Sequence, residues 1–117
     1  MRVLVLIDGE HYPPVTRTGI DAVRAEGDEV VAALLLGGAE KLRAGVELDV
    51  GAPVRSAGGS GAVATLSEAI EELRPDCVVD LSDEPVVGYR ERMHLASAAL
   101  AKGVAYRGAD FRFEPPW

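Results

Sequence analysis

A chain of 117 residues, 48% of them hydrophobic and 26% charged, can bury one modest core and is too short for two. Nineteen acidic against twelve basic residues give a net charge of −7, which argues against nucleic acid because phosphate neutralisation needs a basic surface. The single cysteine, Cys77, excludes an internal disulfide, and no apolar run reaches the roughly 18 residues of a membrane span. We therefore expect a single cytoplasmic domain, residues 1–117, that binds neither nucleic acid nor membrane.

The first 36 residues have the pattern of a β-α-β unit. Residues 3–7 form a continuous apolar run, which is typical of a strand covered on both faces. A second strand is expected at 29–36, after Gly27 and Asp28. Between the strands, small and apolar residues recur at helical spacing behind two prolines: Val15, Gly19, Ala22 and Val23.

The segment from 39 to 57 has a less regular pattern. Residues 40–44 are compatible with one helical turn. Residues 46–50 and 52–55 are compatible with two short strands paired around Gly51. This segment therefore carries the weakest structural prediction of the chain.

A helix is clearly indicated between Ser60, its expected cap, and Pro75, its expected stop. Its apolar positions have spacings of three, four and three: Val63, Leu66, Ile70 and Leu73. A strand at 76–81, a helix at 89–102 and a strand at 104–106 complete the prediction. The alternation predicts a three-layer α/β/α sandwich with a mostly parallel, Rossmann-like sheet of four or five strands.

The predicted helix at 89–102 has two different faces. We expect its core face to be formed by Tyr89, Met93, Ala96 and Leu100. The other face carries Arg90, His94 and Ser97. This second face is compatible with plain solvation or with a place near the functional loops.

Three polar loops follow predicted strands: Asp8–Tyr12, Ser82–Pro85 and Arg107–Asp110. Because ligands of parallel sheets bind outside the carboxyl ends of the strands, we expect all three loops at one edge. Asp8–Tyr12 and Ser82–Glu84 should lie side by side there and form one polar crevice. Asp80 is expected to be buried at its strand end, hydrogen-bonded to a loop amide.

Several interpretations of these polar residues stay open. Asp8 is also compatible with a helix cap, and Glu10 and His11 with a solvated pair. Asp8, Glu10 and His11 have the chemistry of metal ligands, but no second histidine lies nearby, so we assign no metal site. Ser82–Pro85 is compatible with an ordinary polar loop.

Familiar catalytic motifs are missing from the sequence. It contains no GxxxxGK[ST] phosphate loop and no GxSxG nucleophile elbow. Gly59-x-Gly61-x-x-Ala64 fits the loose dinucleotide pattern but does not lie in the first β-α unit, so we interpret it as a linker. The chain is therefore not expected to hydrolyse ATP alone.

Three segments in the same order resemble the N-terminal domain of the cyclic 2,3-diphosphoglycerate synthetase family: LIDGEHYPPV, DLSDEPVVGYRERMHLASAAL and GVAYRGADFRFEPP. The resemblance implies an α/β domain followed by a P-loop domain. It also implies that the whole enzyme uses ATP and Mg²⁺ to close 2,3-diphosphoglycerate into its cyclic phosphoanhydride. Since this chain has no P-loop, we expect it to contain no cofactor by itself and not to be catalytically competent alone.

The resemblance suggests a role for each polar side chain at the expected edge. Phosphate would be bound by Arg17, Arg90 and Arg107. The substrate hydroxyl or a bound Mg²⁺ would be held by Glu10, Asp83 and Glu84. His11 would give a hydrogen bond, and Asp8, Tyr12 and Ser82 complete the substrate-binding set.

Two other functions remain alternatives. One is a non-catalytic interaction module that packs on the C-terminal P-loop domain or forms a homodimer, since Tyr12, Tyr89 and Trp117 suit an interface. The weaker one is a stand-alone metal-dependent hydrolase that uses Asp8, Glu10 and His11.

Overall fold

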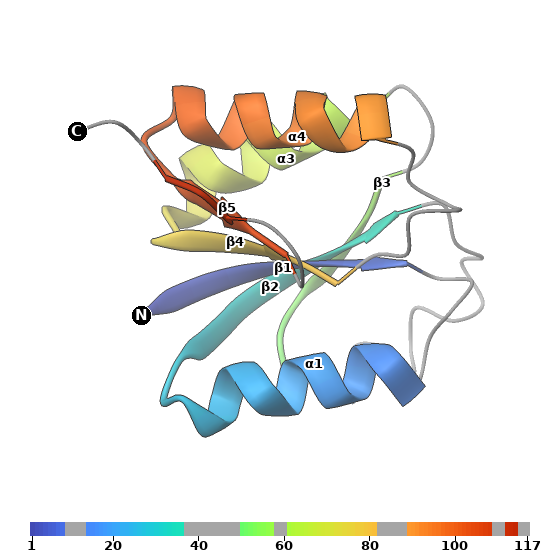
Figure 1. Ribbon diagram of the computed structural model, residues 1–117, viewed down its shortest axis with the longest axis vertical. Helices are drawn as coiled ribbons and strands as arrows, with labels where there is room; N and C mark the ends of the chain where they lie inside the picture. The colour runs from blue at the N-terminus through green and yellow to red at the C-terminus, as the bar shows by residue number, and fades with distance from the viewer. Residues whose placement is uncertain (9–13, 37–49, 58–60, 82–88, 109–111, 115–117) are drawn as a thin grey trace.

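The computed structural model describes residues 1–8, 14–36, 50–57, 61–81, 89–108 and 112–114. A twisted sheet lies at the centre, with α1 on one face and α3 and α4 on the other (Figure 1). In chain order the elements are β1 (Arg2–Asp8), α1 (Pro14–Ala25), β2 (Glu29–Leu36), β3 (Val54–Ala57), α3 (Ala62–Leu73), β4 (Cys77–Asp80), α4 (Tyr89–Ala101), β5 (Ala105–Arg107) and β6 (Arg112–Phe113).

The sheet has the strand order β3-β2-β1-β4-β5-β6. The first five of these strands run parallel, and β6 pairs antiparallel with β5. The predicted three-layer α/β fold with a mostly parallel sheet is therefore confirmed. The sequence analysis missed β6, whose two residues are too few to show an alternating pattern.

The order in which strands are added to the sheet reverses between β1 and β4. β2 and β3 lie on one side of β1, and β4, β5 and β6 lie on the other. β1 pairs with β2 on one side, where Asp8 lies opposite Leu36, and with β4 on the other, where Leu6 lies opposite Asp80. After β1 the chain continues into α1, and after β4 into α4 on the opposite face (Figure 1). The carboxyl ends of β1 and β4 thus flank a topological switch point, where open α/β sheets bind their ligands.

Two separate cores cover the faces of the sheet, and β1 contributes to both. Leu4 and Leu6 belong to the core under α3 and α4, which also contains Leu66 and Leu95. Val3, Val5 and Ile7 belong to the core under α1, together with Ile20. This alternation explains the unbroken apolar run of β1, because both of its faces are buried.

The helix ends differ slightly from the prediction. Gly61 is the N-cap of α3 and makes no side-chain cap hydrogen bond, so the prediction of Ser60 as the cap is wrong. Arg74 ends the helix in the left-handed conformation (φ 48°), and its amide donates to the Ile70 carbonyl at 2.9 Å. Pro75 follows at once, as expected. Among residues 18–25 of α1, the buried one is Ile20, whereas Ala22 of the predicted stripe is exposed; the side chain of Val15 lies outside what the structure describes.

The irregular segment before α3 contains one strand instead of a hairpin. β3 occupies 54–57 and pairs in parallel with β2. Val50, expected to end a strand, has helical backbone, and Gly51 has a positive φ of 65° that suits glycine. The expectation of two strands paired around Gly51 is therefore wrong for residues 50–57, and the rest of that segment lies outside the described residues.

Candidate functional site

The carboxyl edge of the sheet gathers the ends of β1 and β4 and the beginnings of three helices. α1, α3 and α4 each follow a parallel strand, so their N-termini lie at this same edge (Figure 1). The first turns of α1 and α3 contain no acidic residue. Because a helix N-terminus carries about half a positive charge, the backbone at this edge favours an anion.

A buried carboxylate lies at the end of β4. The Asp80 side chain is 1% exposed, and the Tyr106 hydroxyl donates to its Oδ2 at 2.5 Å. The Nε of Arg92 lies 3.2 Å from the same oxygen. We call Asp80, Tyr106 and Arg92 the Asp80 cluster; it joins β4, β5 and α4.

The electrostatics of the Asp80 cluster follow from its burial. Tyr106 is fully buried, and loss of solvation, helped by the charge and the hydrogen bond of Asp80, raises the pKa of the phenol well above its usual value. The hydroxyl thus stays protonated and donates. Arg92, whose side chain is 16% exposed, brings a positive charge that compensates the carboxylate. The expected burial of Asp80 is confirmed; a tyrosine and an arginine are among its partners, and the expected loop amide, after Leu81, lies outside the described residues.

Arg92 was not expected as a partner of Asp80, because the sequence pattern placed the buried face of α4 on other residues. Among residues 92–101 of α4, the buried ones are Leu95, Ala96 and Ala99, whereas Met93 and Leu100 are only half-buried. Arg92 precedes Leu95 by three positions and thus lies on the buried face. Of the predicted stripe, Ala96 is confirmed, Met93 and Leu100 are only half-buried, and the side chain of Tyr89 lies outside what the structure describes. The signal that an arginine could belong to the core was the buried acid at the preceding strand end.

The structure places some of the predicted site residues and does not describe others. Asp8 is the last residue of β1, Arg17 lies in the first turn of α1, and Arg90 in the first turn of α4. These positions are at the carboxyl edge. Outside the described residues lie Glu10, His11, Tyr12, Ser82, Asp83 and Glu84. The strand ends that flank the expected crevice are neighbours, and the crevice itself stays a prediction.

Arg107, the third candidate for phosphate, already has a partner. It ends β5, and its Nε and Nη2 lie 2.9 and 2.8 Å from Oε1 of Glu114. This hydrogen bond raises the pKa of Arg107 above its usual value. Phosphate binding by Arg107 would therefore require exchange of Glu114 for the ligand; the side chains of Arg17 and Arg90, the other two candidates, lie outside what the structure describes.

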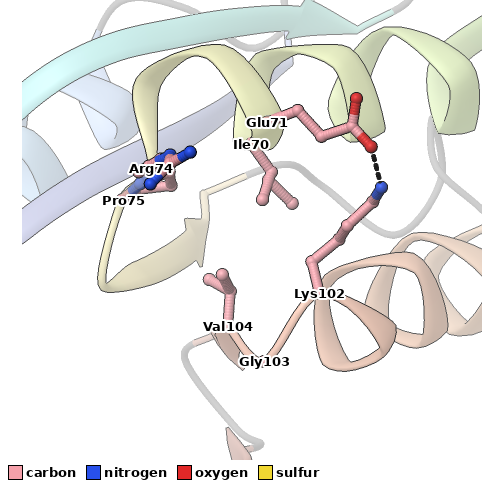
Figure 2. A pocket seen from close by; sticks show the side chains of 7 residues that line it. All are labelled: Ile70, Glu71, Arg74, Pro75, Lys102, Gly103 and Val104. Carbon is pink, nitrogen blue, oxygen red and sulfur yellow. Dashed lines mark hydrogen bonds and ion pairs between the residues drawn. The ribbon is translucent and has the colours of Figure 1, made fainter.

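A pocket of about 560 Å³ lies at the opposite, amino edge (Figure 2). It is lined by Ile70, Glu71, Arg74, Pro75, Lys102, Gly103 and Val104. The Lys102 ammonium group donates to Glu71 across it, which lowers the pKa of Glu71. The carboxyl ends of α3 and α4 lie beside this pocket, so its backbone field opposes an anion. The pocket therefore lacks the electrostatics of an anion site.

The described residues contain neither a cluster of metal ligands nor a helix that could span a membrane. Within the described ranges, no three His, Cys, Asp or Glu side chains gather as metal ligands. Glu10 and His11 of the alternative metal site lie outside these ranges. In the part of the chain that the structure describes, no helix has the length and hydropathy needed to cross a membrane.

Comparison with known proteins decides the family. Residues 2–114 match the family described as "Cyclic 2,3-diphosphoglycerate synthetase, N-terminal domain". The chain belongs to this family. Three relatives named cyclic 2,3-diphosphoglycerate synthetase come from Rubrobacter xylanophilus (51% identical over 117 residues), Thermococcus onnurineus (46% over 112) and Methanothermobacter thermautotrophicus (38% over 120). The alignments cover 99%, 96% and 97% of this chain and 26%, 25% and 26% of the relatives.

The synthetase relatives are about four times longer than the aligned region. The chain thus spans about a quarter of their length and corresponds to the N-terminal domain of the synthetase. A further domain in the whole enzyme is consistent with this length.

Proposed function

We propose that this domain binds 2,3-diphosphoglycerate at the carboxyl edge of its sheet, between the ends of β1 and β4. The observation that carries the proposal is the match to the synthetase N-terminal domain over residues 2–114 in a chain whose fold has its switch point at this edge. The remaining three quarters of the relatives' length would supply the ATP chemistry.

Local electrostatics support an anionic substrate despite the net charge of −7. The helices α1, α3 and α4 begin at the edge of the proposed site; the first turns of α1 and α3 have no acid, and that of α4 has Glu91 beside Arg90. Arg17 and Arg90 lie in the first turns of α1 and α4. Guanidinium groups bind phosphate through paired, charge-assisted hydrogen bonds. The helix N-termini and the two arginines would thus attract an anion, and a bridging Mg²⁺ would offset the repulsion from the acids proposed for the same edge, Asp8, Glu10, Asp83 and Glu84.

The tasks of this domain in the whole synthetase would be binding, orientation and exclusion of water. Closing a phosphoanhydride joins two phosphate groups of one substrate, and an activated phosphate is easily lost to hydrolysis. A domain that fixes both groups supplies proximity. ATP and Mg²⁺ would enter with the remainder of the enzyme, and Glu10, Asp83 and Glu84 are the residues of this chain we propose for a bridging Mg²⁺. The buried, unbridged Cys77 suits the reducing cytoplasm in which we expect the enzyme to act.

Calorimetric titration of 2,3-diphosphoglycerate into the chain, with and without Mg²⁺, tests the proposal. We expect saturable heat and amide shifts in solution spectra. Arg17→Ala and Arg90→Ala should each weaken binding about tenfold or more, since each removes a charge-assisted hydrogen bond. Arg24→Ala is the matched control, because it removes the same charge from the last turn of α1 at the amino edge.

Failure of the wild-type chain to bind would overturn the substrate-binding role. The chain would then be better described as an interaction module. Sedimentation of the chain alone, and mixed with the remaining part of a relative, would distinguish a homodimer from a complex between domains.

A further inference from the structure

Resting on the proposed function, we propose that Asp80, Tyr106 and Arg92 are positioning residues, which hold the carboxyl end of β4 and the first turn of α4 in the fixed relation that substrate binding requires.

The Asp80 cluster lies where the chain passes from β4 to α4. Asp80 is the last residue of β4, and the amide of the next residue, Leu81, donates to the Leu6 carbonyl of β1 at 2.8 Å. Arg92 is in the first turn of α4, and Tyr106 is in β5. The Asp80 cluster therefore connects three elements, and its aspartate and arginine lie where the chain leaves β4 and enters α4.

The Asp80 cluster buries charged groups beside an apolar core. Burying a carboxylate and a guanidinium is costly, and an ion pair of this kind is often no more stabilising than apolar side chains of the same volume. The surroundings are apolar, since Leu6 and Leu95 are fully buried in the same core. Stability alone therefore gives little reason for a charged group at Asp80. The hydrogen bond from the Tyr106 hydroxyl at 2.5 Å fixes distance and angle, which apolar packing leaves freer, and the Arg92–Asp80 ion pair at 3.2 Å adds an attraction between α4 and the end of β4.

The two ends of α4 are connected to the rest of the fold by ion pairs that differ in exposure. The far end is tied to α3 by Lys102 and Glu71, a pair whose side chains are 34% and 64% exposed. Such an exposed pair contributes little and tolerates movement. At the near end the Asp80 carboxylate is almost completely buried. Between these two connections, the buried one is thus at the end that carries Arg90, a proposed phosphate ligand.

The consequence is that a change in the Asp80 cluster should alter binding through position and not through direct contact. Tyr106 is fully buried and Asp80 nearly so, and neither has to touch the substrate. A shift of the first turn of α4 would move Arg90 relative to the end of β1. Supporting residues of this kind typically change affinity about 10-fold to 100-fold when removed.

The test uses Tyr106→Phe, which removes the hydroxyl and keeps the ring, and Asp80→Asn, which keeps the shape and removes the charge. Ile70→Val, in the core beside the amino-edge pocket, is the matched control for a small loss of packing. The first readout is hydrogen exchange at the amides of Leu81 and Met93, relative to Leu34 in β2. The second is the Kd for 2,3-diphosphoglycerate.

We expect Tyr106→Phe to speed exchange at Leu81 and Met93 about tenfold more than at Leu34, and to raise the Kd about tenfold. Asp80→Asn should act in the same direction, and Ile70→Val should change the Kd less than about twofold. If the two cluster variants lower the thermal midpoint but match Ile70→Val in exchange and Kd, the positioning role is wrong. If wild type does not bind, the proposed function fails, and the exchange measurement alone decides whether the cluster holds these two segments.

Discussion

The two edges of the sheet show opposite uses of polar groups. At the carboxyl edge an aspartate is buried between a tyrosine and an arginine, and three helices begin. At the amino edge the polar contacts are peripheral: the Lys102–Glu71 pair, the Arg2 amide donating to Asp76 at 2.8 Å, and the N-terminal amine 3.5 Å from Asp28. The pocket between Glu71 and Lys102 lies at the amino edge, yet the helix C-termini beside it produce an electrostatic field that opposes anions. A hollow surface is therefore weaker evidence for an anion site than helix direction and strand order.

The largest effect should come from removing the carboxylate of the Asp80 cluster. Asp80→Ala should lower the free energy of unfolding by about 3 kcal/mol, because Arg92 and the Tyr106 hydroxyl lose the acceptor that both contact. Urea denaturation at pH 7 measures this. A loss below about 1 kcal/mol would mean that the two edges do not differ in energy as we argue.

Alkaline pH should weaken the carboxyl edge next. The pKa of Tyr106 is raised in the folded state, so the contribution of the neutral phenol is complete below the unfolded pKa of about 10 and is lost as the pH rises above it. Relative to Tyr106→Phe, wild type should lose about 1.4 kcal/mol for each pH unit above 10. Denaturation between pH 9 and about 12, with tyrosinate absorbance, gives the comparison; parallel curves would contradict it.

A substitution that changes the packing between α1 and Leu81, the residue after β4, should have a smaller effect on the free energy of unfolding. A Cβ at Gly19 would lie 2.7 Å from Cδ2 of Leu81. Gly→Ala inside a helix normally gains up to about 1 kcal/mol, and here the overlap should cancel that gain. In a Leu81→Ala background, the same Gly19→Ala change should stabilise by about 0.5 to 1 kcal/mol. Thermal unfolding of all four variants closes the cycle, and equal effects in both backgrounds would disprove the contact.

The smallest effect belongs to the amino edge. Lys102→Ala removes the exposed pair with Glu71 and should move the thermal midpoint by less than about 2 °C. In the same scan at about 0.5 M salt, the difference in midpoint between Lys102→Ala and wild type should shrink, because salt screens the exposed pair that only wild type has. A drop comparable to that of Asp80→Ala would remove the distinction between the edges.

Prediction from sequence succeeded where the signal was local. The limits of β2, 29–36, were predicted as found, because an apolar run bounded by a glycine turn has few alternatives. Ser60 was wrong as a cap by one position, since glycine at 61 also permits a helix start. The core face of α4 was misplaced at Met93 and Leu100, because Leu95 and Ala99 are the buried residues and Arg92 lies on their face. Of the candidate site, the sequence indicated the edge and the burial of Asp80 but not its partners.

The sequence by itself determined most of the elements, though not β3 or β6, together with the α/β class and the family resemblance, because each rests on periodicity or on motifs of neighbouring residues. Tertiary structure alone decided that β4 returns to pair with β1, which places two strand ends 72 positions apart, Asp8 and Asp80, at one switch point. It also decided that Asp80, Arg92 and Tyr106 meet. Such contacts depend on which faces of the strands and helices pack together. The free energy of burial over the whole sheet decides this packing, whereas the preference of any one segment for helix or strand does not.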